Sequence, residues 1–179
     1  LPRPLATLVV EYASQLQGVY QHKRGSKGSG DGQFDCPLGI AVHGGEVFVT
    51  DGSNNRVVVC GLDGTFKRKW GSKEGSGDGE FDYPAGIAVH GGEAFVVDSK
   101  NHRVQVFTKD GTFVRKWGSE GSAEGEFKYP QGIAVDNEHV YVADDQNHRV
   151  QVFTKGGVFV RVVGNGQGDG EGQLNAPEG

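Results

Sequence analysis

The sequence has no methionine, only two cysteines and no long apolar run. A transmembrane helix needs about 20 consecutive apolar residues, and no segment approaches that length. Two cysteines are too few for the disulfide framework of a small secreted domain. The net charge of −5 also argues against a strongly basic nucleic-acid-binding protein.

The same shortages lead to two expectations about the origin of the chain. We expect Cys36 and Cys60 to be free thiols, which weakly favours a reducing, cytoplasmic location. Because residue 1 is Leu1 and no methionine is present, we also expect the sequence to be a fragment of a longer protein.

Glycine, by contrast, is abundant: it makes up 31 of the 179 residues, against a usual share of about 7%. It does not occupy every third position, which excludes collagen. Much of it belongs to an internal repeat. The segment Pro-x-Gly-Ile-Ala-Val begins at Pro37, Pro84 and Pro130, and a further copy starts at Pro177, so that the spacings are 47, 46 and 47 residues. Repeats of this length are typical of solenoids and propellers.

Each repeat contains four short segments rich in Val, Ile and Phe, separated by turn residues, and these predict four β-strands. In the first repeat they are residues 39–42, 47–50, 56–60 and 65–70. No segment shows a sustained helical period. Four antiparallel strands per repeat describe a blade of a β-propeller.

We therefore predict an all-β fold: an incomplete β-propeller with three full blades and partial blades at both ends. The full blades are expected at residues 26–71, 72–118 and 119–164. Residues 1–25 are expected to be the divergent end of a preceding blade, and residues 165–179 an interblade loop and the start of a further blade.

The repeats resemble the NHL repeat. The resemblance rests on Asn101-His102-Arg103-Val104-Gln105-Val106-Phe107, which recurs at residues 147–153, and on the Pro-x-Gly-Ile-Ala-Val segments. The first repeat departs from it, with Asn54-Asn55-Arg56 in place of Asn-His-Arg. The resemblance implies a propeller of about six blades that acts as a noncatalytic scaffold and binds partners through one face.

Propeller topology places the interblade loops and the turns between second and third strands on the same side, which we call the top face. Residues in those turns are our candidates for partner binding, and we interpret the histidines among them as solvated. The candidates are Lys100, Asn101, His102, Gln146, Asn147 and His148. The loops and turns of this face are net acidic, which favours a protein partner over RNA, because RNA affinity depends on neutralising phosphates. No membrane contact or small-molecule substrate is indicated.

Acidic and basic residues bracket each of these turns, and we interpret them as structural clasps. A carboxylate and a guanidinium five residues apart would hold the turn closed through charge-assisted hydrogen bonds. The pairs are Asp51 and Arg56, Asp98 and Arg103, and Asp144 and Arg149. Because the pair recurs in every repeat, a role in the blade is favoured over a role in binding one ligand.

No metal site or cofactor is predicted. The Gly-Asp-Gly segments at residues 30–32, 77–79 and 168–170 lack the converging acids that calcium requires and are typical of turns. His102 and His148 share one turn position and His43 and His90 another, on opposite faces, so neither pair has the third ligand of a zinc site.

Two features of the outer strands have structural interpretations. Trp70 and Trp117 are expected to pack against the next blade, near Phe81 and Phe127. The bases in the fourth strands suggest either a lateral basic groove or protection of the exposed edge, and we favour edge protection. They include Lys67, Arg68, Lys69, Arg115, Lys116 and Arg161.

Two alternatives to a protein scaffold remain. One is a propeller enzyme, because the repeats also resemble those of peptidyl-hydroxyglycine amidating lyases, whose metal-binding histidines lie between the motif proline and glycine. Here that position holds Leu38, Ala85, Gln131 and Glu178, so these residues support no catalytic site. The other is an RNA-binding NHL domain of a RING/B-box-type ubiquitin ligase, whose zinc modules would lie outside these residues.

Overall fold

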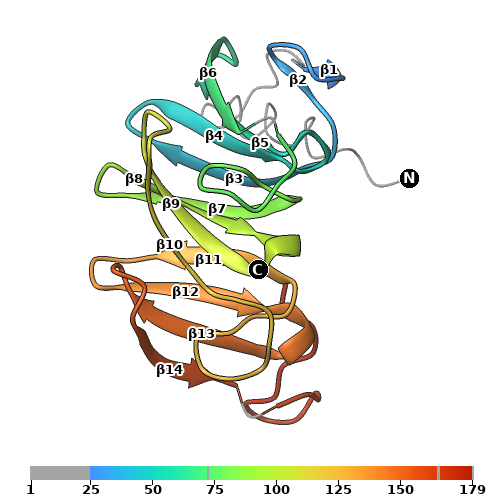
Figure 1. Ribbon diagram of the computed structural model, residues 1–179, viewed down its shortest axis with the longest axis vertical. Helices are drawn as coiled ribbons and strands as arrows, with labels where there is room; N and C mark the ends of the chain where they lie inside the picture. The colour runs from blue at the N-terminus through green and yellow to red at the C-terminus, as the bar shows by residue number, and fades with distance from the viewer. Residues whose placement is uncertain (1–24, 72, 165, 179) are drawn as a thin grey trace.

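The computed structural model describes residues 25–71, 73–164 and 166–178. These residues form three four-stranded antiparallel sheets that follow one another in chain order (Figure 1). The prediction for residues 1–24, the end of a preceding blade, lies outside the described residues. No α-helix occurs among the described residues, and none of their helices is long and apolar enough to span a membrane.

The strands match the four segments expected in each repeat. In the first sheet they are β3 (Pro37–His43), β4 (Glu46–Asp51), β5 (Arg56–Gly61) and β6 (Phe66–Gly71). In the second they are β7 (Pro84–His90), β8 (Glu93–Asp98), β9 (Arg103–Thr108) and β10 (Phe113–Trp117). In the third they are β11 (Pro130–Val135), β12 (His139–Asp144), β13 (Arg149–Thr154) and β14 (Phe159–Val163). Two shorter strands, β1 (Ser26–Lys27) and β2 (Gln33–Phe34), pair in parallel before the first sheet.

Each sheet is a simple meander, so its first strand lies at one edge and its fourth at the other. The turn between the second and third strands is one turn of 3-10 helix followed by a residue in the left-handed conformation. These helices are η1 (Gly52–Asn54), η2 (Ser99–Asn101) and η3 (Asp145–Asn147). The left-handed residues are Asn55, His102 and His148, with φ of 51°, 52° and 52°.

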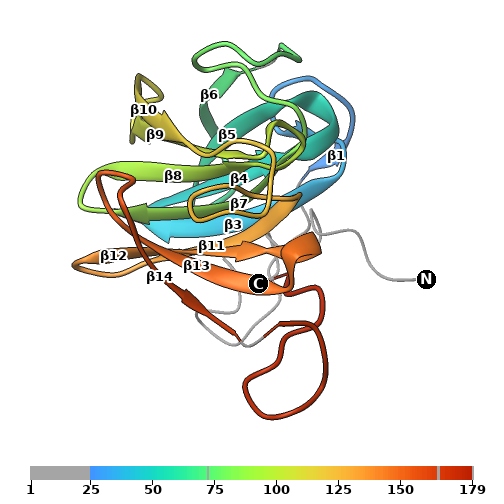
Figure 2. The ribbon, with the colours of Figure 1, turned by 60° about the horizontal axis from the view of Figure 1, so that its bottom comes forward.

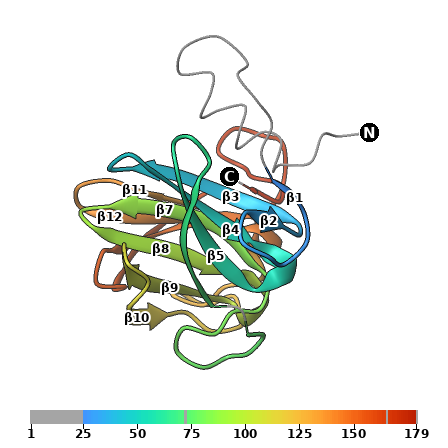
Figure 3. The ribbon, with the colours of Figure 1, turned by 90° about the horizontal axis from the view of Figure 1, so that it is seen from above.

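The first strands pack side by side at the centre, with β7 between β3 and β11 (Figure 3). Glycine is required there because the backbones approach closely. A Cβ added at Gly39 would collide with the carbonyl oxygen of Ala85, and one at Gly86 with that of Gln131. The glycine of the repeated motif thus sets the spacing between blades.

Apolar side chains fill the space between successive sheets, which are seen stacked face to face in Figure 2. Trp70 belongs to the cluster that also contains Phe81, and its ring lies 5.8 Å from that of Phe107. Trp117 lies in the next cluster with Phe127, 5.8 Å from Phe153. Each tryptophan therefore packs against the following blade, and this sandwich of sheets around a central row of first strands confirms the predicted all-β propeller architecture.

Candidate functional site

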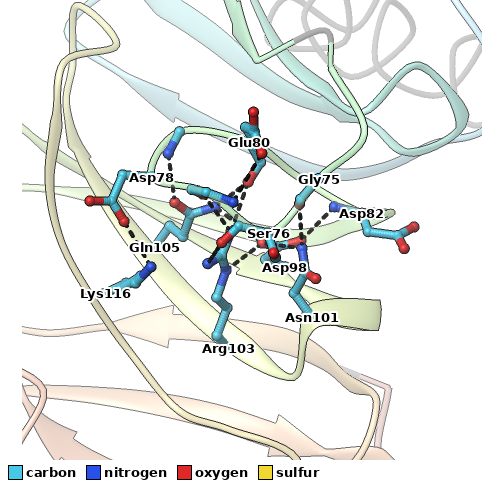
Figure 4. A network of polar contacts seen from close by, with 12 residues as sticks. Gly75, Ser76, Asp78, Glu80, Asp82, Asp98, Asn101, Arg103, Gln105 and Lys116 are labelled. Carbon is cyan, nitrogen blue, oxygen red and sulfur yellow. Dashed lines mark hydrogen bonds and ion pairs between the residues drawn. The ribbon is translucent and has the colours of Figure 1, made fainter.

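On the top face the interblade loop is fastened to the turn of the blade that follows it (Figure 4). The Nδ2 of Asn101 donates to the carbonyl oxygen of Gly75 at 2.8 Å. The guanidinium of Arg103 donates to the carbonyl oxygens of Ser76, Gly77 and Glu80 at 2.6, 2.9 and 2.9 Å. The loop backbone is thereby held by side chains that begin in the turn and the third strand.

Asp98 lies at the centre of this network and is fully buried. Its Oδ2 accepts hydrogen bonds from Arg103 Nε at 2.7 Å, Asn101 Nδ2 at 3.0 Å and Gln105 Nε2 at 3.1 Å. Its Oδ1 accepts the backbone N–H of Asp82 at 2.8 Å. Burial raises the pKa of the Asp98 carboxyl, and these hydrogen bonds act against that rise.

The same arrangement recurs in the other two blades. Arg56 Nε lies 2.8 Å from Asp51 Oδ2, and Arg149 Nε lies 2.7 Å from Asp144 Oδ2. Gln151 occupies the place of Gln105 in the third blade, whereas the first blade has Val58 there. All three Asp–Arg pairs are thus in contact, and every arginine also binds loop carbonyl groups.

The histidines of the turns connect successive blades. His102 Nδ1 accepts the backbone N–H of Tyr129 at 3.1 Å, and His148 Nδ1 that of Ala176 at 3.0 Å. In the first blade Asn55 Oδ1 accepts the N–H of Tyr83 at 2.9 Å in the same way. His102 is only 8% exposed. The interpretation of this residue as a solvated turn histidine is therefore wrong, because the left-handed backbone directs its ring onto the next blade.

Of the six residues predicted to bind a partner, Lys100 and Gln146 have exposed side chains. Asn101 and Asn147 are partly buried and donate to the loop carbonyls of Gly75 and Gly121. With both histidines bonded to the next blade, the structure places four of the six residues in its internal network. Lys100 lies 3.2 Å from Asp82 and over the ring of Tyr83, at 5.4 Å from its centroid.

Sequence reasoning missed the residues that precede the motif prolines. Cys36, Tyr83, Tyr129 and Ala176 have φ of 56°, 58°, 49° and 45°. A residue before proline normally prefers extended backbone, so this conformation was not expected. The signal available in the sequence was that the position varies, while the residues around it repeat.

These residues bring cysteine and tyrosine side chains to the top face, and Cys36 remains a free thiol, as does buried Cys60. Cys36 Sγ lies 3.0 Å from the hydroxyl of Tyr83, and this hydrogen bond, with burial, raises the pKa of Tyr83 to about 12. Tyr129 is 38% exposed, and its ring lies 4.7 Å from that of His102. The tyrosines therefore cover the joints between blades and also face solvent.

The first strands line an open groove of about 470 Å³ at the centre. Leu38, Ala85, Gln131 and Glu178, the four residues between motif proline and glycine, all border it. Within residues 25–71, 73–164 and 166–178 no three His, Cys, Asp or Glu side chains are grouped to hold a metal ion.

The bases of the outer strands form ion pairs across the first two blades. Arg68 lies 2.7 Å from Glu46 and also donates to the carbonyl oxygen of Lys109 in the next blade. Arg115 repeats this arrangement with Glu93, at 2.6 Å, and Lys155. The hydrogen bond from Arg68, together with Lys67, lowers the pKa of Glu46 to about 2. These bases therefore do not form an open lateral groove in the first two blades.

Two family models match the chain. One, described as NHL repeat, matches residues 34–60, and one described as 6-bladed beta-propeller matches residues 84–148. None of the curated proteins compared with the sequence matches it.

Several solved structures have a similar fold. Hydrazine synthase of Kuenenia stuttgartiensis matches with a TM-score of 0.57 and 16% identity over 76% of this chain and 38% of that one. Glutaminyl cyclase of Myxococcus xanthus gives 0.54 and 14%, over 71% and 52%. Virginiamycin B lyase of Staphylococcus aureus, a catalytically inactive H270A variant with quinupristin, gives 0.55 and 19%, over 75% and 41%. The chain thus spans 38 to 52% of these chains, and at such identities the likeness concerns the fold.

The fold and its repeated clasps define the class: blades of a β-propeller. The two matched models, over residues 34–60 and 84–148, support an NHL-repeat propeller.

Proposed function

We propose that the chain is a noncatalytic part of a propeller scaffold that binds a protein partner through its top face. One observation carries the proposal: the polar residues that recur in every blade are used inside the structure, and the exposed positions around them differ. Lys100 and Gln146 occupy equivalent exposed turn positions, and before the prolines the exposed Cys36 of the first blade stands where the next two blades have Tyr83 and Tyr129. Varied side chains on rigidly held loops are the usual basis of specific recognition.

The chemistry of this face favours a protein partner. Tyrosine is enriched at energetically important interface positions, and Tyr129 is both exposed and held in place by packing on His102. The interblade loops carry exposed acids, including Glu74, Glu120 and Glu124, which would repel the phosphates of RNA.

The enzyme alternative has less support in these residues. The similar structures are those of a synthase, a cyclase and a lyase, but the likeness to them lies in the fold. The four side chains at the position of the lyase histidines are Leu38, Ala85, Gln131 and Glu178, which offer one carboxylate and no imidazole. An RNA-binding domain of a RING/B-box-type ligase is the other alternative, and RNase treatment distinguishes it from a protein-binding scaffold.

The test is affinity capture on the immobilised chain, with quantitative mass spectrometry and RNase-treated and untreated arms. The substituted chain carries Lys100→Ala, Tyr129→Ala and Gln146→Ala, all on the top face. The control carries Lys109→Ala and Asn137→Ala, both on the opposite face. Lys109 lies in the turn between the third and fourth strands of the second blade, and Asn137 lies in the turn between the first and second strands of the third blade.

We expect a set of proteins whose RNase-resistant capture falls at least tenfold with the top-face substitutions and is unchanged in the control. Capture that disappears after RNase treatment would replace the protein partner by RNA. Specific capture that is equal in all three chains would locate the binding surface elsewhere.

A further inference from the structure

The outer strand of the third blade, β14, differs in composition from its counterparts β6 and β10. In each blade the outer strand pairs with the third strand. Lys69 of β6 lies opposite Val58, and Lys116 of β10 lies opposite Gln105. At the equivalent place β14 has Val162, which lies opposite Gln151. Two residues earlier, at the bulge, β6 has Lys67, whereas β10 has Val114 and β14 has Val160, so only the place of Val162 distinguishes β14 from both. Val160 and Val162 are 41% and 38% exposed.

Lys69 and Lys116 each form an ion pair that Val162 cannot form in the third blade. Lys69 lies 2.9 Å from Asp31, and Lys116 lies 2.8 Å from Asp78. In the third blade Val162 stands in place of the base, and His139 stands where Glu46 and Glu93 bind the outer-strand arginines. Arg161 is the single charge within β14, and it forms no ion pair with any residue that the structure describes.

The edge of β14 therefore lacks the lysine that, in β6 and β10, protects the edge from pairing with a strand of another chain. Among the residues that the structure describes, the outer strands are paired on one side only, which leaves their other backbone edge open to a further strand. Charges on such an edge act chiefly against identical copies, because a strand with two or three adjacent bases repels itself. β6 has Lys67-Arg68-Lys69 and β10 has Arg115-Lys116, whereas the exposed residues of the β14 region are mostly valine: Val158, Val160, Val162 and Val163.

We propose that β14 pairs antiparallel with β14 of a second copy of this chain, forming a two-fold symmetric dimer. A pairing centred on Val162 brings the two Val162 side chains together and places Arg161 opposite Val163 of the second copy. This register uses the regular part of the strand beyond the bulge between Phe159 and Arg161. It also avoids placing the two Arg161 side chains directly opposite each other, which like charges disfavour.

The dimer is expected to be weak. Two strands of five residues bury far less than the roughly 1,600 Å² of a standard interface. We expect a dissociation constant of about 0.1 to 1 mM, corresponding to roughly 4 to 5.5 kcal/mol. This contact is independent of the proposed top-face binding, since β14 is the outer strand of its sheet.

The test is sedimentation equilibrium of the chain from about 10 μM to about 1 mM, a range that spans this affinity. The chain should shift from monomer to dimer with concentration. Val160→Lys with Val162→Lys should keep it monomeric throughout, and the fold should persist because β6 has lysine at both positions. Val114→Lys in β10, at the place of Val160, is the matched control and should leave the association unchanged.

Hydrogen exchange adds a readout that locates the contact. Amides of β14, and not those of β10, should become at least severalfold more protected at high concentration. A monomer at every concentration overturns the proposal. A dimer that survives both lysines, or that is lost equally in the Val114→Lys control, overturns it as well, because association then uses another surface.

Discussion

His102 accepts through Nδ1 the backbone N–H of Tyr129, 3.1 Å away, although the two residues belong to successive blades. The accepting group is a histidine nitrogen in two blades and the Asn55 amide oxygen in the first. In each case the backbone of the acceptor residue is in the left-handed conformation. The residue whose N–H it binds has the same conformation. The second position of the repeated Asn-His-Arg thus joins blades, and partner binding is not required to explain its recurrence.

We expect His102→Ala to lower the free energy of unfolding by about 1 to 3 kcal/mol, because it leaves a backbone N–H unpaired and places alanine at positive φ. His102→Asn should retain most of the stability, since asparagine tolerates this conformation and Asn55 already makes the same bond. Urea unfolding of the two variants and the unsubstituted chain measures the difference. Equal losses in the two variants would show that the ring itself, and not the acceptor, stabilises the joint.

The buried clasp gives a second prediction. Arg103→Ala should cost about 3 to 5 kcal/mol, because Asp98 is fully buried and would lose its charged partner. Gln105→Val should cost only about 1 kcal/mol, since the first blade has Val58 at this place and Arg103 still binds the carbonyl oxygen of Glu80. Thermal and urea unfolding of the two single variants provide the comparison, and a Gln105→Val loss as large as that of Arg103→Ala would contradict this ranking.

The repeat made the architecture predictable from the sequence, because the period, the turn residues and the strand composition all agree. The Asp–Arg contacts followed from the four-residue turn that returns the chain beside itself. The burial of His102 did not follow, because it depends on how far one blade lies from the next. Neither did the left-handed pre-proline residues, such as Tyr83, because local preference favours extended backbone and the interblade hydrogen bond overrides it.

Acid should weaken the fold partly through Glu46. Its pKa is lowered from an ordinary 4.5 to about 2 by Arg68 and Lys67, so the folded state favours the ionised carboxylate. The stability that this pair contributes is fully present above pH 4.5 and is lost as the pH falls toward 2. Glu46→Gln should therefore reduce stability at neutral pH and flatten its decline over that interval.

Urea midpoints measured from pH 7 to pH 2 test this, with Glu120→Gln as control. Glu120 is exposed and forms no ion pair with any described residue. The control should follow the unsubstituted chain at every pH. A Glu46→Gln curve parallel to the unsubstituted one would show that the ion pair does not contribute to acid sensitivity.

Trp70 lies against Gly111 across the joint between the first two blades. Gly111 has a φ of +93°, and a Cβ added there would come within 2.9 Å of the Trp70 ring. Gly91 also has positive φ, at +60°, but nothing lies within 4 Å of its added Cβ. Gly91→Ala should therefore cost about 1 kcal/mol, the usual penalty for alanine in this conformation. Gly111→Ala should cost about 1 to 3 kcal/mol more, because the buried tryptophan must shift out of a packed core. Urea unfolding gives both values, and tryptophan fluorescence should move to the red only in Gly111→Ala. Equal costs with unchanged fluorescence would mean that the joint adapts without strain, and that glycine is present at position 111 for its turn alone.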